Sequence, residues 1–470
     1  MISGSETFRG RIVDVAQQLF GGLDFIMREA ALFAATGFLL LGLGDLAVDL
    51  LWLGSRIRRL GRPGLAISDL PKPARAGRLA VFVPAWDEAS VIGAMLRAAV
   101  SAWGEGDWRI YVGTYPNDPA TYAAAAAVGH PRIRLVRGLE PGPTTKADCL
   151  NRLWEAMLAD EALEGRRSKA VVLHDAEDLV HPDELRLFDG LVERFDLVQL
   201  PVLPLIDPES NWLGGHYADE FAESHGKELV VRGALGAGLP SAGVGCAFSR
   251  EALGRLADGR GGRPFDSDSL TEDYELGLRI ADAGGRSAFL RVAAADGSLI
   301  ATREYFPGTL AASVRQKSRW MAGIALSGWD RLGWTGGAAE RWMRLRDRQS
   351  LLAAALLGSG YLALALWLVL KAWQGAGGEG PAPLPAALSA LVAVNLALLG
   401  WRMAIRAGFT TAAHGWREGL RAIPRMAIGN FVLILAAASA LARYGAQRRG
   451  GRPRWDKTAH IFPAAAAAAE

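Results

Sequence analysis

This sequence has few cysteines and a net charge close to zero. Its 470 residues include only Cys149 and Cys246, so no disulfide framework is implied and both are expected to be small buried side chains. The 52 basic and 49 acidic residues give a formal charge of only +3. The basic excess gathers beside apolar runs, at 56–62, 341–348 and 448–454. This pattern is typical of cytoplasmic membrane flanks, and we expect no nucleic-acid partner.

A cleavable signal peptide and a repeat of solenoid length are also not apparent in the sequence. Half of the residues are hydrophobic, and the mean hydropathy is +0.14. That value is high for a soluble enzyme and low for a transporter built mainly of membrane helices. The composition therefore predicts a soluble domain joined to membrane segments.

Apolar runs divide the chain into membrane and soluble parts. Residues 1–30 carry an amphipathic pattern, which predicts a helix that lies on the membrane surface or packs against the protein. Transmembrane helices are expected in the runs that are long enough to cross a bilayer, at 31–53, 350–371 and 386–405. We interpret a fourth run, 426–442, as interfacial or re-entrant, with a transmembrane helix as the alternative. A fourth crossing would place the basic tail, 443–470, outside.

The distribution of basic residues predicts the orientation of these segments. Lys and Arg are denser after the first run than before it, the loop 373–385 has neither, and 402–425 is basic. The region 77–348 should therefore be cytoplasmic in a multi-pass membrane protein. Within the first run, Asp45 and Asp49 share one helix face, which either lines a path through the membrane or lies near the headgroups.

The region 77–348 alternates buried strands with helices. Strands are predicted at 79–84, 110–113, 133–136 and 170–174, with helices at 90–102, 120–127 and 146–159. The expected fold class is α/β with a mostly parallel sheet, flanked by transmembrane helices. Ligands bind such sheets at the carboxyl ends of the strands.

Acidic residues follow directly after the fourth predicted strand. Asp175, Glu177 and Asp178 could hold Mg²⁺ or Mn²⁺, whose charge would neutralise a leaving diphosphate. Alternatively, they are solvated loop acids that cap the helix beginning near Pro182. His174 is expected to be a structural histidine with satisfied hydrogen bonds.

A second acidic motif, Thr271, Glu272 and Asp273, precedes a predicted helix at 274–281. Thr271 suits the N-cap position, and two acids at a helix N-terminus interact favourably with the helix dipole. The functional alternative makes Asp273 a general base, which removes a proton from a sugar hydroxyl as that hydroxyl attacks an anomeric carbon. A single attack of this kind inverts the anomeric centre.

A third motif places Gln316, Arg319 and Trp320 on one face of a helix. Arg319 could bind a diphosphate through two hydrogen bonds, and Trp320 could offer an apolar plane to a sugar ring. The alternative is a basic amphipathic helix on the membrane surface.

Five motifs in order carry a family resemblance, at 83–88, 145–151, 175–178, 271–273 and 316–320. Together they resemble the membrane-bound, processive family 2 glycosyltransferases, which include cellulose, hyaluronan and chitin synthases. Further segments at 218–223, 240–245 and 455–460 resemble most closely the bacteriophage-adsorption protein B-like inner-membrane glycosyltransferases, which make a surface polysaccharide. The resemblance covers nearly the whole chain.

This resemblance implies a nucleotide-diphospho-sugar transferase domain of the GT-A type and a set of donor contacts. Donor-binding roles are implied for Pro84, Asp87, Glu88, Lys146, Asp175, Gln316 and Arg319. Metal binding is implied for Asp175 and Glu177, with Asp178 as an alternative because a glutamate stands in the usual third position of the Asp-x-Asp motif. Asp118 is a candidate for the contact with the nucleotide base, where many relatives carry two aspartates.

The resemblance also implies a base and an acceptor site. Asp273 would be the catalytic base, and acceptor contacts would come from Trp320, Glu272, Gly243 and Gly245, the two glycines letting the backbone approach the acceptor sugar. Glu220 and Glu223 are interpreted as an acidic face along the acceptor groove rather than as a second metal site. Longer relatives continue into a cyclic-dinucleotide-binding domain, so direct control by cyclic di-GMP is not expected within this sequence.

The predicted function is inverting transfer of a sugar from a nucleoside diphosphate, with uridine expected, to a growing glycan at the bacterial inner membrane. The alternatives are a single transfer to a polyprenyl phosphate lipid and a non-catalytic scaffold of a polysaccharide secretion machine. The presence of Lys146, Asp175, Asp273 and Arg319 speaks against the scaffold. Expected partners are the donor, the glycan acceptor, the bilayer and an envelope export protein, because few membrane helices are available for a channel.

Overall fold

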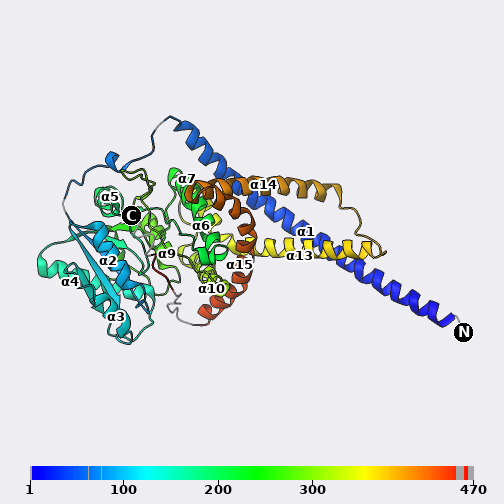
Figure 1. The fold of residues 1–470 in the computed structure, drawn as a ribbon, viewed down its shortest axis with the longest axis horizontal. Coiled ribbons are helices and arrows are strands. Elements are labelled where there is room, and N and C mark those ends of the chain that lie inside the picture. Colours follow the sequence, from blue (N-terminus) through cyan, green and yellow to red (C-terminus); the bar gives the residue numbers. More distant parts are fainter. Residues whose placement is uncertain (1–2, 62, 76, 451–459, 464–470) are drawn as a thin grey trace. The chain divides into compact units, whose positions relative to one another are not determined.

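The computed structural model describes residues 3–61, 63–75, 77–450 and 460–463 (Figure 1). The chain divides into two compact units. The first consists of Met1–Leu50 and Gln349–Ile405, and the second of Leu51–Arg348 and Arg406–Glu470. The second unit contains the sheet and the residues of the predicted site.

The first unit is built from long apolar helices: α1 (Ser3–Arg58), α13 (Ser350–Gly375) and α14 (Ala386–His414), with α1 and α14 ending in the second unit. The expected boundary near residue 30 is not present. Helix α1 is continuous because no proline interrupts this stretch. Among the described residues, four helices are long and apolar enough to cross a membrane: these three and α15 (Trp416–Arg448).

Polar side chains of α1 are paired with α14 inside the first unit. Asp45 forms an ion pair with Arg402, and the indole Nε1 of Trp401 donates to Asp49 Oδ2 at 2.8 Å. Asn395 Nδ2 donates to the carbonyl oxygen of Ala35 at 2.8 Å. These bonds hold the two helices together, so the acids of α1 serve a helix–helix contact in the structure.

The second unit contains a seven-stranded sheet in the order β3-β2-β1-β4-β6-β5-β7. Its strands are β1 (Arg78–Pro84), β2 (Trp108–Thr114), β3 (Ile133–Arg137), β4 (Ser168–Leu173), β5 (Leu197–Gln199), β6 (Cys246–Ser249) and β7 (Ser287–Phe289). Only β6 runs antiparallel to its neighbours. The predicted mostly parallel α/β sheet is confirmed, with strand ends within two or three residues of those expected.

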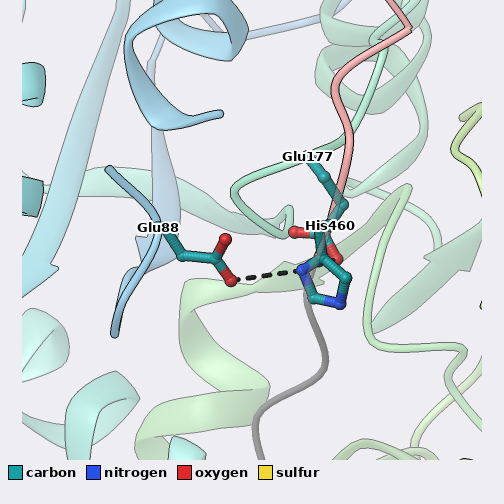
Figure 2. Close-up of side chains that lie close together, drawn as sticks. All are labelled: Glu88, Glu177 and His460. Atoms are coloured by element: carbon teal, nitrogen blue, oxygen red, sulfur yellow. Dashed lines mark hydrogen bonds and ion pairs between the residues drawn. The ribbon is translucent and has the colours of Figure 1, made fainter. Parts of the chain in front are cut away.

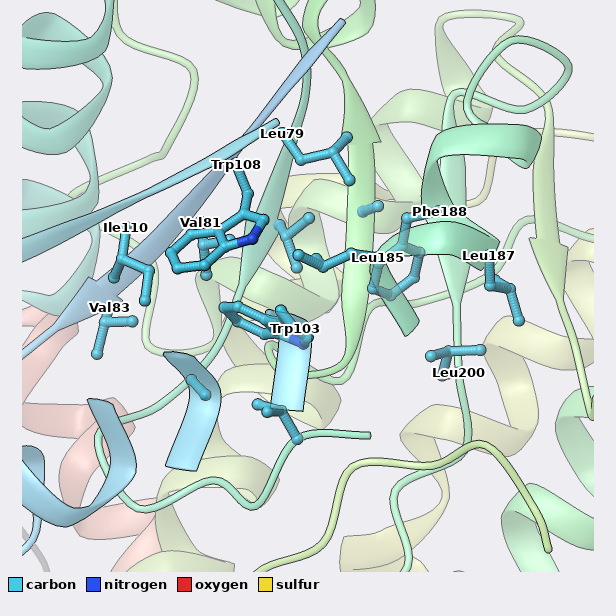
Figure 3. Close-up of a cluster of buried hydrophobic side chains, with 14 of the residues drawn as sticks. Leu79, Val81, Val83, Trp103, Trp108, Ile110, Leu185, Leu187, Phe188 and Leu200 are labelled. Carbon is cyan, nitrogen blue, oxygen red and sulfur yellow. The ribbon is translucent and has the colours of Figure 1, made fainter. Parts of the chain in front are cut away.

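Helices cover both faces of this sheet, so its central strands are apolar on both sides. Leu79, Val81 and Val83 of β1 face the cluster that includes α2 (Ile92–Trp103) and α5 (Glu184–Leu191), as Figure 3 shows. Ala80 and Phe82 face the opposite cluster, which includes α4 (Lys146–Glu164), α8 (Arg250–Asp258) and α9 (Glu272–Asp282). The two cores fix the positions of the helices that begin at the carboxyl edge of the sheet.

The remaining helices of this unit are α3 (Pro119–Ala126), α6 (Leu213–Glu223), α7 (Leu229–Ala234), α10 (Leu310–Met321), α11 (Gly328–Leu332) and α12 (Ala338–Arg348). Helix α15 packs against α10 and α6. The run 426–442 is therefore part of one long helix and is not a re-entrant loop. Its position in or on a membrane stays a prediction.

Candidate active site

Lys146 and Asp175 meet at the carboxyl edge of the sheet. Lys146 is the first residue of α4, which is capped reciprocally: Asp148 N donates to Thr145 Oγ1, and Thr145 N to Asp148 Oδ2, both at 3.1 Å. Asp175 follows β4, and its Oδ1 lies 2.6 Å from Lys146 Nζ. Burial would lower the pKa of Lys146, but Asp175, Glu272 and Asp273 raise it above its usual value. The lysine is therefore a fixed positive charge among three acids.

Glu272 and Asp273 form the first turn of α9, as the sequence predicted. Thr271 lies at the N-cap, but its hydroxyl makes no capping bond, and its buried Oγ1 has no partner among the described residues. Burial raises the pKa of both acids, to about 7 for Glu272, while the charges of Lys146 and Arg319 oppose the rise. Lys146 and Arg319 thus act on the same acid pair.

The raised pKa of Asp273 makes a prediction about pH. If Asp273 is the base, only its ionised form is active, so the rate should fall as the pH drops through this raised pKa. The acidic limb of kcat/KM, which reports groups of the free enzyme, should lie above about 3.9, the usual value for aspartate. Measuring kcat/KM from pH 8 down to the lowest pH at which the protein stays folded tests this, and an acidic limb at or below about 3.9 would contradict it.

The loop before β6 approaches Asp273 closely. Gly243 and Gly245 have φ angles of +79° and +56°. A Cβ on Gly243 would lie 2.4 Å from Asp273 Oδ2, and one on Gly245 would lie 2.2 Å from Thr302 Oγ1. The close approach that these glycines permit is therefore to Asp273 and Thr302. An approach of an acceptor sugar to the same loop stays a prediction.

Gly243→Ala is accordingly expected to lower sugar transfer at least about 10-fold, because the methyl group displaces the carboxylate of Asp273. A left-handed φ alone costs about 1–2 kcal/mol for a residue with a Cβ. Gly236→Ala is the matched control, since its φ is +69° and nothing lies within 4 Å of the added methyl. Transfer rates of both variants should be compared at equal thermal stability. Equal losses in both would contradict the predicted contact.

Gln199, at the end of β5, was missed by the sequence analysis. This fully buried side chain accepts from Ala242 N at 2.8 Å and donates to the carbonyl oxygens of Leu200 and Val244, both at 2.9 Å. A single amide therefore holds the loop that contains Gly243. Its only signal in the sequence is a polar residue at the end of an apolar strand.

The third motif lies on α10, whose N-terminus is capped by Thr309. The indole of Trp320 packs edge-on against Tyr217, with ring centroids 6.0 Å apart, and against Phe306 at 6.3 Å. Gln316 Oε1 is buried with no partner among the described residues. The structure therefore brings an unsatisfied acceptor atom, an aromatic ring and the charge of Arg319 onto the helix predicted to bind donor and acceptor.

A separate cluster joins Glu88, Glu177 and His460, as Figure 2 shows. His460 Nδ1 lies 2.8 Å from Glu177 Oε1 and 3.2 Å from Glu88 Oε1. One ligand atom from each of the three lies within 4.8 Å of the others. Burial would lower the pKa of His460, but the two carboxylates raise it to about 10.

This cluster has the donor set of a divalent metal site. Two carboxylates and an imidazole converge, and the buried Glu177 Oε2 has no hydrogen-bond partner among the described residues. The residues therefore fit a bound cation. His460 belongs to the segment 455–460 that carries part of the family resemblance, but no role was predicted for it. The rest of that segment, 455–459, lies outside the described residues.

Asp178 has a structural role through its Oδ2, and a metal contact through its buried Oδ1, which has no partner among the described residues, stays a prediction. Its Oδ2 lies 2.8 Å from His174 Nδ1 and accepts from Asp175 N at 3.0 Å, while His174 Nε2 lies 2.9 Å from Glu184 Oε1. Burial would lower the pKa of His174, but Glu184 and Asp178 raise it to about 10. The interpretation of His174 as a structural histidine agrees with these bonds, and Asp178 shapes the loop that presents Asp175 and Glu177.

Asp118 also bonds to the protein with both carboxylate oxygens. Its Oδ1 accepts from Thr121 N at 3.2 Å, which caps α3, and its Oδ2 accepts from Asp87 N at 2.6 Å. Asp87 follows the end of β1 at Pro84 and has a φ of +56°. Asp118 thus orders the loop at the predicted nucleotide pocket, and a direct contact with the base stays a prediction.

Comparison with known proteins matches residues 76–323 to the family described as glycosyltransferase like family 2. The chain belongs to this family. Its sequence is 35% identical to bacteriophage adsorption protein B of Escherichia coli K12. It is also 35% identical to bacteriophage N4 adsorption protein B of Escherichia coli O157:H7. Each match covers 96% of the family 2 chain but only 64% of the relative. The family and the mostly parallel sheet confirm the predicted nucleotide-diphospho-sugar transferase fold.

Two solved structures are similar to this family 2 chain. Mannosyltransferase PcManGT from Pyrobaculum calidifontis, in complex with GDP-Man and Mn²⁺, has a TM-score of 0.48 at 20% identity, covering 87% of this chain and 99% of its own. Glucosyl-3-phosphoglycerate synthase from Mycobacterium tuberculosis, with Mn²⁺, UDP and phosphoglyceric acid, has a TM-score of 0.35 at 19% identity, covering 59% and 86%. Neither similarity assigns a ligand to this chain.

Proposed function

We propose that the chain is an inverting glycosyltransferase, which moves a sugar from a nucleoside diphosphate, with uridine expected, to a growing surface or exopolysaccharide chain. The observation that carries this proposal is the group around Asp273: a half-buried carboxylate with a raised pKa, two cations acting on it and a glycine packed against it. The carboxylate can serve as a base, and the two cations can bind a diphosphate. The glycine lets the backbone approach one oxygen of the carboxylate.

In the proposed reaction, Asp273 accepts the proton of an acceptor hydroxyl while the oxygen of that hydroxyl bonds to the anomeric carbon of the donor. The bond from this carbon to the diphosphate oxygen breaks, and the nucleoside diphosphate leaves with the electron pair. Lys146 and Arg319 provide positive charge for the diphosphate, and Trp320 offers its ring to the acceptor sugar. One displacement of this kind inverts the anomeric centre.

Glu88, Glu177 and His460 would hold Mg²⁺ or Mn²⁺, with Asp175 beside them in the same loop as Glu177. A cation there supplies Lewis-acid stabilisation of the negative charge that develops on the diphosphate. The ion pair between Lys146 and Asp175, 2.6 Å long, keeps this aspartate at the edge of the site.

The four long apolar helices support a place in a membrane, which we propose is the bacterial inner membrane, with the sheet-containing unit in the cytoplasm. The acceptor is proposed to be a growing glycan because Trp320 lies among aromatic rings of α6, which suit a sugar chain. An envelope export partner is proposed to receive the product.

The test is donor turnover by the detergent-purified protein against a panel of uridine and guanosine diphosphate sugars, with Mg²⁺, with Mn²⁺ and with a chelator. Metal-dependent release of one nucleoside diphosphate, together with a polymer ladder, is the expected result. A single glycolipid would indicate transfer to a polyprenyl phosphate instead. A folded protein that turns over no donor in native membranes would overturn the enzyme proposal.

A further inference from the structure

Helix α6 carries three acids, of which Glu220 and Glu223 were interpreted from the sequence as an acceptor-groove face. In the structure, each is paired with a basic side chain from another element of the second unit. Asp219 pairs with Arg425 of α15, Glu220 with Lys317 of α10, and Glu223 with Arg406 near the end of α14. These charges are compensated within the protein, and a place for the acids along an acceptor groove stays a prediction.

Lys317 differs from the other two bases because it lies inside the motif of α10. Successive residues of a helix are about 100° apart, so Gln316, Arg319 and Trp320 share one side and Lys317 lies on the flank of that side. A fixed contact on this flank restrains rotation of α10 about its own axis. The direction of Arg319 and Trp320 depends on that rotation.

The surface that receives Lys317 is formed by Tyr217 and Glu220, which lie three residues apart on one face of α6. Lys317 Nζ lies 5.1 Å from the centre of the Tyr217 ring and forms an ion pair with Glu220. Tyr217 also contacts Trp320 edge-on, and its hydroxyl donates to the carbonyl oxygen of Ser313 at 3.4 Å. Two side chains of α6 therefore contact α10 at three points along its length.

The other acids anchor α6 on a second side. Asp219 Oδ1 accepts from Thr410 Oγ1 at 3.2 Å and from Arg425 Nη1 at 3.3 Å. Glu223 Oε1 accepts from Lys227 Nζ at 2.7 Å, in addition to the ion pair with Arg406. Helix α6 is thus held independently of Glu220, and it can serve as a fixed support for α10.

Electrostatics keeps Glu220 charged in this position. Burial would raise the pKa of the Glu220 carboxyl, but Lys317, with a contribution from Arg406, lowers it to about 2. The carboxylate is therefore ionised throughout the pH range of an ordinary assay. Removing Glu220 leaves the ammonium group of Lys317 without the carboxylate that pairs with it.

We propose that Glu220 is a positioning residue that, by pairing with Lys317, fixes the rotation of α10 and directs Arg319 and Trp320 towards Asp273. This inference rests on the proposed function and adds no group to the chemistry. In this proposal, an acid of α6 sets the orientation of α10, the helix that is proposed to hold donor and acceptor.

The test uses the full chain with Glu220→Gln, Lys317→Gln and the charge-reversed pair Glu220→Lys with Lys317→Glu. Each single variant should lower kcat for transfer about 10-fold or more while the donor KM changes less than about 2-fold. The reason is that a misaligned Arg319 loses its contact with the charge that develops on the leaving diphosphate, while Lys146 still binds the donor. The reversed pair should recover most of the loss. Glu155→Gln, which removes an exposed ion pair with Arg263, is the control and should match the wild type.

Wild-type kinetics in either single variant would overturn the proposal. It would also be overturned if the loss of kcat in the reversed pair equalled the product of the losses in the two single variants. Equal losses of donor binding and thermal stability would also overturn it, because they indicate a purely structural role. Hydrogen exchange of the α10 amides gives a second readout. It should be faster in the single variants and restored in the reversed pair, and unchanged exchange would overturn the proposal even if the wild type transfers no sugar.

Discussion

Replacing Asp273 with asparagine is expected to lower sugar transfer by about 10²–10⁴-fold, the usual contribution of a general base. The amide has nearly the same shape as the carboxylate and still fits beside Gly243, but it cannot take up the hydroxyl proton. Lys146 and Arg319 remain charged, so binding of the nucleoside diphosphate should stay within a few-fold of the wild type. Transfer rates and calorimetric titration with the nucleoside diphosphate measure the two effects separately.

The matched control for this variant is Asp258→Asn, an exposed aspartate at the end of α8. It makes the same chemical change on the same sheet-containing unit and should leave transfer unaltered. Full activity of the Asp273 variant would remove this residue from the mechanism. Loss of nucleotide binding together with transfer would instead indicate that Asp273 supports the pocket.

Removing divalent metal should abolish transfer, and His460→Ala should raise the metal concentration needed for half-maximal rate at least about 10-fold. The imidazole is one of three converging donors, and losing one donor weakens a site even when its outer contacts remain. Added Mn²⁺ or Mg²⁺ should restore the rate. Binding of Mn²⁺ measured by its paramagnetic resonance gives a readout that does not depend on activity.

His130→Ala provides the control for this experiment. His130 precedes β3, at the edge of the sheet opposite the carboxyl ends, where it stacks on Trp108. Its loss should leave the metal dependence unchanged. An unaltered metal requirement in His460→Ala would show that the cluster in Figure 2 is an ion-paired group of side chains and not a metal site.

The sequence predicted the parts of the site that depend on strand position. A buried parallel strand ends in a known direction, so Asp175 and Glu177 were expected at the carboxyl edge. Lys146 and Asp273 were expected at helix N-termini, and their place beside these acids was implied by the family resemblance. Local pattern contained this information because the period of a strand or helix fixes which residues lie at its end.

Other parts depended on tertiary contacts that no local pattern specifies. His460 is distant in the sequence from Glu88 and Glu177. Gln199 looks like any other polar residue at the end of a strand, and only the loop that packs over it reveals its role. For the acids of α6, the same spacing suits a solvated groove or a set of ion pairs. The choice depends on bases supplied by α10, α14 and α15, whose packing could not be read from α6 alone.

The two hydrogen bonds accepted by Asp118 have a consequence for the stability of this region. One carboxylate closes both the first turn of α3 and the turn at Asp87. Because both bonds end on one side chain, fraying of the helix terminus and loosening of the loop are coupled through Asp118. The stability of the loop at the proposed nucleotide pocket therefore depends in part on the N-terminus of α3.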